Sequence, residues 1–231
     1  MFTFAGKLHI NNFSCIMANV IKIKKGLDIN LKGKASDVLL NGGKSDSYAI
    51  VPDYYNGIVP KVVAKVGEKV KAGSVLMIDK NRPEIKFVSP VSGEVTAVNR
   101  GEKRKVLSVV VKPEAQIEYE DFGKKNVASL KREEVKEAIL HAGMWPFIKQ
   151  RPYDIIANPA DMPKAIFVSG FDSAPLAPDF DITLTDELAA LQSGIDCLNK
   201  LGGKNVNLNL KEGTPSSSVF TKLKNVEVNY F

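Results

Sequence analysis

One short segment combines aromatic rings with a guanidinium group. The stretch "GMWPFIKQRP" (143–152) holds Trp145, the only tryptophan, with Phe147 and Arg151 close by. Aromatic faces and an arginine can hold a flat ring by stacking and by a charge-assisted hydrogen bond. The same residue types also form packed hinges, because aromatic side chains bury large areas. The candidate ligand contact is therefore Trp145, Phe147 and Arg151, and the alternative is a packed hinge between domains.

A lysine between two glycine turns raises a second kind of chemistry, that of a biotin- or lipoyl-type carrier domain. Lys80 lies seven residues after Gly73 and thirteen before Gly93. A carrier lysine has to occupy the tip of its hairpin, where it swings freely, and the midpoint of this segment is Pro83. One turn motif is also weak support for a modification. We predict that Lys80 is an unmodified surface residue, with a carrier domain as the alternative.

The other reactive residue types do not form a recognisable site. The loop from Gly170 to Thr185 has three aspartates, at 172, 179 and 181, and no glycine cluster. Carboxylates there would repel a phosphate, so we expect no NAD or flavin at this turn. No G-x-S-x-G or H-E-x-x-H motif is present, so no catalytic residue is predicted.

Cysteine and histidine are too scarce for a metal centre. The chain has two of each, widely separated: Cys15, Cys197, His9 and His141. A zinc or iron–sulfur site needs three or four converging ligands, and disulfide frameworks need more cysteines. We predict no metal, no iron–sulfur cluster and a reducing compartment.

Charge divides the chain into a basic and an acidic part. Residues 61–112 carry twelve Lys/Arg against five Asp/Glu, whereas residues 161–198 carry one lysine against seven acids. The basic part could meet anionic lipid or an acidic partner, or could simply be solvated. Nucleic acid is not expected, because Phe87 is its only aromatic residue. No apolar run reaches the length of a membrane span, so we expect no transmembrane segment.

The first half of the chain has the pattern of strands and turns. Residues 20–41 alternate in short stretches between glycines. Two similar stretches follow, "VPKVVAKVGEKVKAG" (59–73) and "SPVSGEVTAVNRGEKRKV" (89–106), and residues 74–88 join them. This arrangement predicts a small sandwich of two β-halves.

Helices are predicted only in the second half. Ser129 is the predicted N-cap of a helix that ends at Gly143. Further on, a strand over 165–171, a helix capped by Thr185 and a strand over 204–211 form a βαβ unit, which indicates a parallel α/β sheet. The apolar face of that last helix is predicted to contain Leu188, Leu191, Ile195 and Leu198.

Four separated motifs together resemble one known family. They are "IKIKKGLDINLKG" (21–33), "DKNRPEIKFVSPVSGEVTAVNRGEKRKVLSVVV" (79–111), "GMWPFIKQRP" (143–152) and "AIFVSGFDSAPLAPD" (165–179). In this order they are similar to the A subunits of the bacterial Na+-translocating NADH:quinone reductase, the NQR complex. Family members are roughly twice as long, so we expect the chain to be a truncated fragment without activity of its own.

The fold implied is a barrel-sandwich hybrid domain of the biotinyl/lipoyl type, followed by a Rossmann-like α/β domain. We predict five regions: an upstream extension before Met17, N-terminal strands, the barrel-sandwich domain, a helical and proline-rich linker, and the α/β domain. Their bounds are 1–16, 17–43, 44–115, 116–163 and 164–231.

The resemblance also implies a function. The chain is expected to be a peripheral subunit on the cytoplasmic face of the bacterial inner membrane, in a complex that passes electrons from NADH to ubiquinone or menaquinone and exports sodium. It implies other NQR subunits as partners, including membrane subunits, and quinone as the ligand of the site at Trp145, Phe147 and Arg151. The remaining alternative is a scaffold without a ligand, whose basic surface docks a membrane subunit.

Overall fold

The computed structural model describes residues 19–21, 26, 29, 31–33, 36–40 and 42–231. The predictions for residues 1–16, for a start at Met17 and for Cys15 and His9 lie outside these residues. So do most of the strands predicted over 20–41. One short strand is described there, β1 (Asn19–Val20), and it pairs in parallel with the last strand of the chain.

Two small sheets form the first domain. One has the order β2 (Tyr48–Ile50), β8 (Val106–Pro113), β7 (Gly93–Arg100) and β4 (Lys69–Val70). The other has the order β3 (Pro60–Val62), β5 (Val75–Asp79) and β6 (Lys86–Val88). Alternate apolar residues turn inward between the sheets, where Leu76, Val95, Val109 and Val111 are fully buried. The predicted barrel-sandwich hybrid is confirmed.

A linker leads from β8 to helix α1 (Arg132–His141). The prediction that Ser129 caps this helix was wrong: its hydroxyl donates to the Asn126 carbonyl oxygen at 2.9 Å, within a separate 3-10 helix over Val127–Ser129. The α-helix begins three residues later, where the Glu134 carboxylate accepts a hydrogen bond from the Lys131 backbone N–H at 2.7 Å. Gly143 ends the helix in the left-handed conformation, with φ of 68°, as predicted.

The second domain is a parallel sheet with the order β1, β13 (Val226–Tyr230), β12 (Val206–Leu210) and β11 (Phe167–Ser169). Helices α2 (Phe180–Thr183) and α3 (Leu188–Gly202) connect β11 to β12, which confirms the βαβ unit. The predicted cap at Thr185 was wrong, because its hydroxyl donates back to the Asp181 carbonyl oxygen at 2.5 Å, at the end of α2. The predicted apolar face of α3 does pack against β12.

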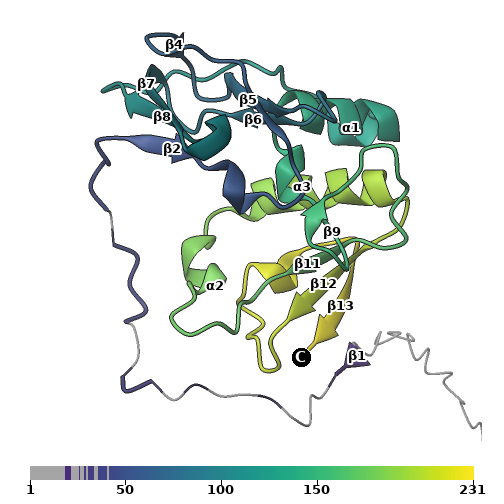
Figure 1. Ribbon diagram of the computed structural model, residues 1–231. Helices are drawn as coiled ribbons and strands as arrows, with labels where there is room; N and C mark the ends of the chain where they lie inside the picture. Colours follow the sequence, from purple (N-terminus) through teal and green to yellow (C-terminus); the bar gives the residue numbers. More distant parts are fainter. Residues whose placement is uncertain (1–18, 22–25, 27–28, 30, 34–35, 41) are drawn as a thin grey trace, which may run out of the picture.

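In Figure 1, helix α3 lies between the sandwich and the parallel sheet, and helix α1 lies beside the β5–β6 side of the sandwich. The buried side chains Phe87 of β6, Val135 of α1 and Leu201 of α3 belong to one apolar cluster. The short strands β9 (Lys149–Gln150) and β10 (Ile155–Ile156) pair beside it, and Ile156 is part of the same cluster. The two domains therefore share a core. Among the described residues, no helix has both the length and the apolarity needed to cross a bilayer.

Candidate functional site

Trp145 lies in the core that the two domains share. It begins a 3-10 helix, Trp145–Phe147, and its side chain is only 5% exposed. The indole Nε1 donates a hydrogen bond to the Ala157 carbonyl oxygen at 2.7 Å. Because the indole N–H has a hydrogen-bond partner inside the protein, the buried Trp145 side chain needs no ligand to satisfy its polar atom. The packed-hinge alternative describes this residue well.

Phe147 and Arg151 point to solvent instead. Phe147 is 67% exposed. The Arg151 side chain is 81% exposed, and its Nη1 lies 4.0 Å from Oδ1 of Asp154. An exposed pair at this distance holds the guanidinium only weakly, so its donors remain accessible to a ligand. The three predicted contact residues are therefore divided between the core and the surface.

Lys80 is exposed in the bend that follows β5. The tip of the β5–β6 hairpin lies further along, at a turn that includes Pro83 and Glu84. The lysine backbone N–H donates to the Val59 carbonyl oxygen at 2.7 Å, which fixes the chain at the base of the loop. That the amine carries no cofactor stays a prediction.

Asp79, next to Lys80, was not singled out from the sequence, yet it organises this hairpin. Its side chain is fully buried. Oδ1 accepts hydrogen bonds from the backbone N–H groups of Val59 at 3.1 Å and Asn81 at 3.2 Å. Oδ2 accepts one from Arg82 Nε at 3.0 Å, and Arg82 Nη1 donates to the Ile156 carbonyl oxygen at 3.2 Å. The hairpin is thereby attached to β10 rather than free to swing.

An apolar groove of about 720 Å³ lies between this hairpin, the linker and helix α1. Small side chains at Ala138 and Ala142, one helical turn apart, line it together with Ile139. Two large apolar side chains at its wall remain partly exposed, Phe122 at 37% and Met144 at 53%. The volume lies within the range of small-ligand sites, and the charged residues Glu84, Lys86, Lys125 and Glu137 line the groove together with the apolar ones. The sequence signal that could have located this groove is the pair of alanines on a helix face that also carries larger apolar residues.

Two groups capable of chemistry line the same groove. The His141 ring packs edge-on against Phe122, with ring centroids 5.4 Å apart and planes at 89°. Cys197 enters from α3, and its thiol is free. Burial raises the pKa of the Cys197 thiol, and the neighbouring charge of Asp196 raises it further. The thiol is therefore protonated at neutral pH and is a poor nucleophile there.

Alkylation of Cys197 by iodoacetamide should follow this pKa. In a Cys15→Ser background we expect slower labelling at pH 7.5 than for a small free thiol, with the rate still rising above pH 9. Labelling is slower at pH 7.5 because only the thiolate reacts with iodoacetamide, and a raised pKa moves thiolate formation to higher pH. Peptide mass analysis across pH measures the rate. Labelling as fast as that of the free thiol at pH 7.5 would contradict the buried, protonated state.

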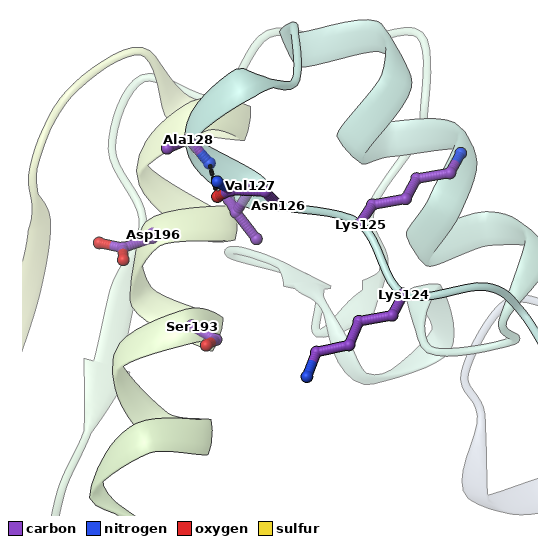
Figure 2. A pocket seen from close by; sticks show the side chains of 7 residues that line it. All are labelled: Lys124, Lys125, Asn126, Val127, Ala128, Ser193 and Asp196. Carbon is purple, nitrogen blue, oxygen red and sulfur yellow. Dashed lines mark hydrogen bonds between the residues drawn. The ribbon is translucent and has the colours of Figure 1, made fainter.

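A second pocket, of about 530 Å³, lies where the linker passes α3. Figure 2 shows Ser193 and Asp196 on helix α3 and Lys124 and Asn126 on the linker beside it, with the Asp196 carboxylate pointing away from Lys124. The Asn126 side chain accepts a hydrogen bond from the Ala128 N–H at 3.1 Å, so it serves the local turn. Asp196 accepts one from Gln192 at 3.0 Å. Both hydrogen bonds are local, the first within the linker turn and the second within α3.

The aspartates of the loop before α3 have structural partners. Asp179 accepts a hydrogen bond from the Asp181 N–H at 2.9 Å and caps α2. Asp181 accepts from the Ser218 hydroxyl at 2.5 Å and from the Val219 N–H at 3.2 Å, which joins α2 to the segment before β13. Within the described part of the chain, no three His, Cys, Asp or Glu residues group as metal ligands would. That the chain binds no NAD, flavin or iron–sulfur cluster stays a prediction.

Two protein-family models match this sequence in succession. Residues 21–114 match the NqrA N-terminal barrel-sandwich hybrid domain. Residues 130–231 match the NqrA second alpha/beta domain. Both matches agree with the order of the two domains in the structure.

Curated relatives share one name, that of the A subunit of the Na(+)-translocating NADH-quinone reductase. The protein of Aliivibrio salmonicida is 36% identical over 202 residues, which are 86% of this chain and 45% of the relative. That of Vibrio vulnificus is 36% identical over 216 residues, or 92% of this chain and 47% of the relative. That of Photorhabdus laumondii is 35% identical over 184 residues, which are 79% of this chain and 41% of the relative.

The chain thus spans less than half the length of these relatives. Within that span the similarity covers both domains and the segment that joins them. With two consecutive family models and relatives at this identity, the chain belongs to the family of A subunits of the Na+-translocating NADH-quinone reductase.

Proposed function

We propose that this chain acts as a peripheral, quinone-associated subunit of a sodium-translocating NADH-quinone reductase. It would lie at the cytoplasmic face of the bacterial inner membrane and bind other subunits of that complex, membrane subunits among them. Electrons would pass from NADH to ubiquinone or menaquinone in the assembled complex. The role of this chain would be to hold or orient the quinone.

The observation that carries the quinone proposal is the apolar groove and its connection to Phe147. Met144 lines the groove, and its carbonyl oxygen accepts the Phe147 N–H at 3.3 Å. A quinone tail could lie along the apolar wall formed by Ala138, Ala142 and Met144. The ring would then lie against exposed Phe147, and Arg151 would donate a hydrogen bond to a quinone carbonyl oxygen.

Trp145 has a different role in this proposal from its neighbours. Its ring is buried and its N–H is occupied by Ala157, so it positions the turn that presents Phe147. No quinone contact to the indole N–H is needed. The proposed ligand contacts are therefore Phe147 and Arg151, with Trp145 supporting them from the core.

Ubiquinone-1, a quinone with a short tail, provides a test. Trp145 is the only tryptophan, so quenching of its fluorescence reports binding without an added label. We expect saturable quenching. Arg151→Gln should raise the Kd roughly tenfold, as expected for loss of one charge-assisted hydrogen bond. Ala142→Phe, which fills the groove, should raise it at least as much.

Tyr153→Ala is the matched control, because this side chain lies two residues from Arg151 and is 78% exposed. Its Kd should equal that of the parent chain. Weaker binding in Ala142→Phe alone would place the quinone in the groove and remove Arg151 from the proposal. Absence of saturable quenching would favour the scaffold alternative, in which the basic sandwich surface docks a membrane subunit.

A further inference from the structure

The turn between β7 and β8 gathers four cations within six residues. Arg100, Lys103, Arg104 and Lys105 are all exposed; these four residues are called the basic tip below. One acid, Glu102, lies in the same turn. Lys105 Nζ lies 2.7 Å from Oδ2 of Asp53, whereas the amine of Lys103 has no partner among the described residues. The tip therefore keeps a net positive charge after its local pairs are formed.

The backbone of the basic tip is unfavourable for the residues that occupy it. Lys103 and Arg104 both have left-handed backbone conformations, with φ of 51° and 61°. They are the two central residues of a turn closed by the Lys105 N–H and the Glu102 carbonyl oxygen at 3.0 Å. Asn and Gly are the residues that such turns favour, because other side chains crowd the backbone there. Both side chains are exposed, so packing within the chain does not offset this cost.

Apolar side chains lie next to these cations. The Lys105–Asp53 pair holds the 3-10 helix Pro52–Tyr54 beside the turn, and Tyr54 is 79% exposed. Leu107, 43% exposed, lies against Gly101 at the base of the turn. Long cationic side chains beside an exposed tyrosine and leucine form the combination found where proteins contact a lipid interface.

From this combination we infer that the basic tip binds the headgroups of anionic phospholipids, with Tyr54 and Leu107 entering the interface beside them. Lys and Arg near a negatively charged bilayer are attracted to it, and partial insertion of apolar residues adds to the attraction. Single-stranded nucleic acid fits less well, because base stacking needs several exposed aromatics and Phe87 is buried. The inference refines the proposed membrane location, and it does not depend on quinone binding.

Sedimentation with vesicles tests it. We expect the chain to bind vesicles of phosphatidylglycerol mixed with phosphatidylcholine at low salt, to leave them at about 0.5 M NaCl, and not to bind pure phosphatidylcholine. Lys103→Asn combined with Arg104→Gly should weaken binding roughly twenty-five-fold, at about fivefold for each cation removed. The same variant should be at least as stable as the parent, since both new residues suit the turn.

The matched control is Lys204→Gln combined with Lys211→Gln, which removes two exposed lysines at the ends of β12. This control should bind vesicles like the parent chain. Equal losses in both variants would show general charge attraction and overturn the assignment to the tip. Failure of the parent to bind anionic vesicles at low salt would overturn lipid binding itself and favour an acidic protein as the partner of the tip. Quinone titration is unaffected by either result.

Discussion

Replacing Asp79 with alanine should lower the free energy of unfolding by about 3–5 kcal/mol. The carboxylate is fully buried and accepts three hydrogen bonds, two from backbone N–H groups and one from Arg82. Alanine would leave those donors without a partner, and the Arg82 guanidinium, with a side chain only 22% exposed, would lose its counterion. Removing one member of a buried pair costs far more than the net contribution of the pair. Urea unfolding followed by circular dichroism measures the difference.

The control for Asp79 is Asp53, whose pair with Lys105 is exposed on both sides. Asp53→Ala should cost less than about 1 kcal/mol, because solvent screens exposed pairs. Should Asp79→Ala prove too unstable to purify, Asp79→Asn keeps one acceptor oxygen and should cost about 1–3 kcal/mol. A loss at Asp79 no larger than that at Asp53 would show that the hairpin is not held by this carboxylate.

Trp145→Ala should destabilise the chain by about 3–5 kcal/mol. The ring lies in the cluster that joins the sandwich to α1 and α3, and alanine would leave a cavity between the two domains. The Ala157 carbonyl oxygen would also lose its hydrogen bond from the indole. The transition should be measured by circular dichroism, since the variant has no tryptophan.

Phe147→Ala, two residues away, provides the comparison for Trp145. The Phe147 ring is 67% exposed, so its removal should lower the free energy of unfolding by less than about 1 kcal/mol. The same substitution should weaken quinone binding. Trp145→Phe should behave in the opposite way, with reduced stability and an unchanged quinone Kd measured by equilibrium dialysis. If Trp145→Phe instead abolished quinone binding at full stability, the indole would be a ligand contact and the packing role would be wrong.

Much of the fold could be predicted from local patterns in the chain. Alternating valines indicated the sandwich, and the spacing of Leu191 and Ile195 indicated the buried face of α3. Gly143 marked a helix end because its left-handed conformation is easy only for glycine. The helix starts were predicted less well, at Ser129 and Thr185. Both hydroxyls are used by the preceding turn, and several residues near a helix start can compete for the same backbone groups.

The family and the order of the two domains follow from the amino-acid sequence, and so does the clustering of aromatic residues within 143–152. Which of those residues would be buried does not follow from it. Trp145 is in the core because Phe87 and Leu201, distant in the chain, close around it, and because Ala157 accepts its N–H. Phe147 is exposed because no such partners meet it.

The groove depends on long-range contacts for the same reason. Its walls come from the β5–β6 hairpin, the linker, α1 and α3. The position of the hairpin depends on a partly buried hydrogen bond from Arg82 to the Ile156 carbonyl oxygen. Periodicity reports which face of one element is apolar, because that follows from neighbours along the chain. Which apolar faces meet, and where they leave room for a ligand, is set by contacts between residues far apart in sequence, and only the folded chain brings those together.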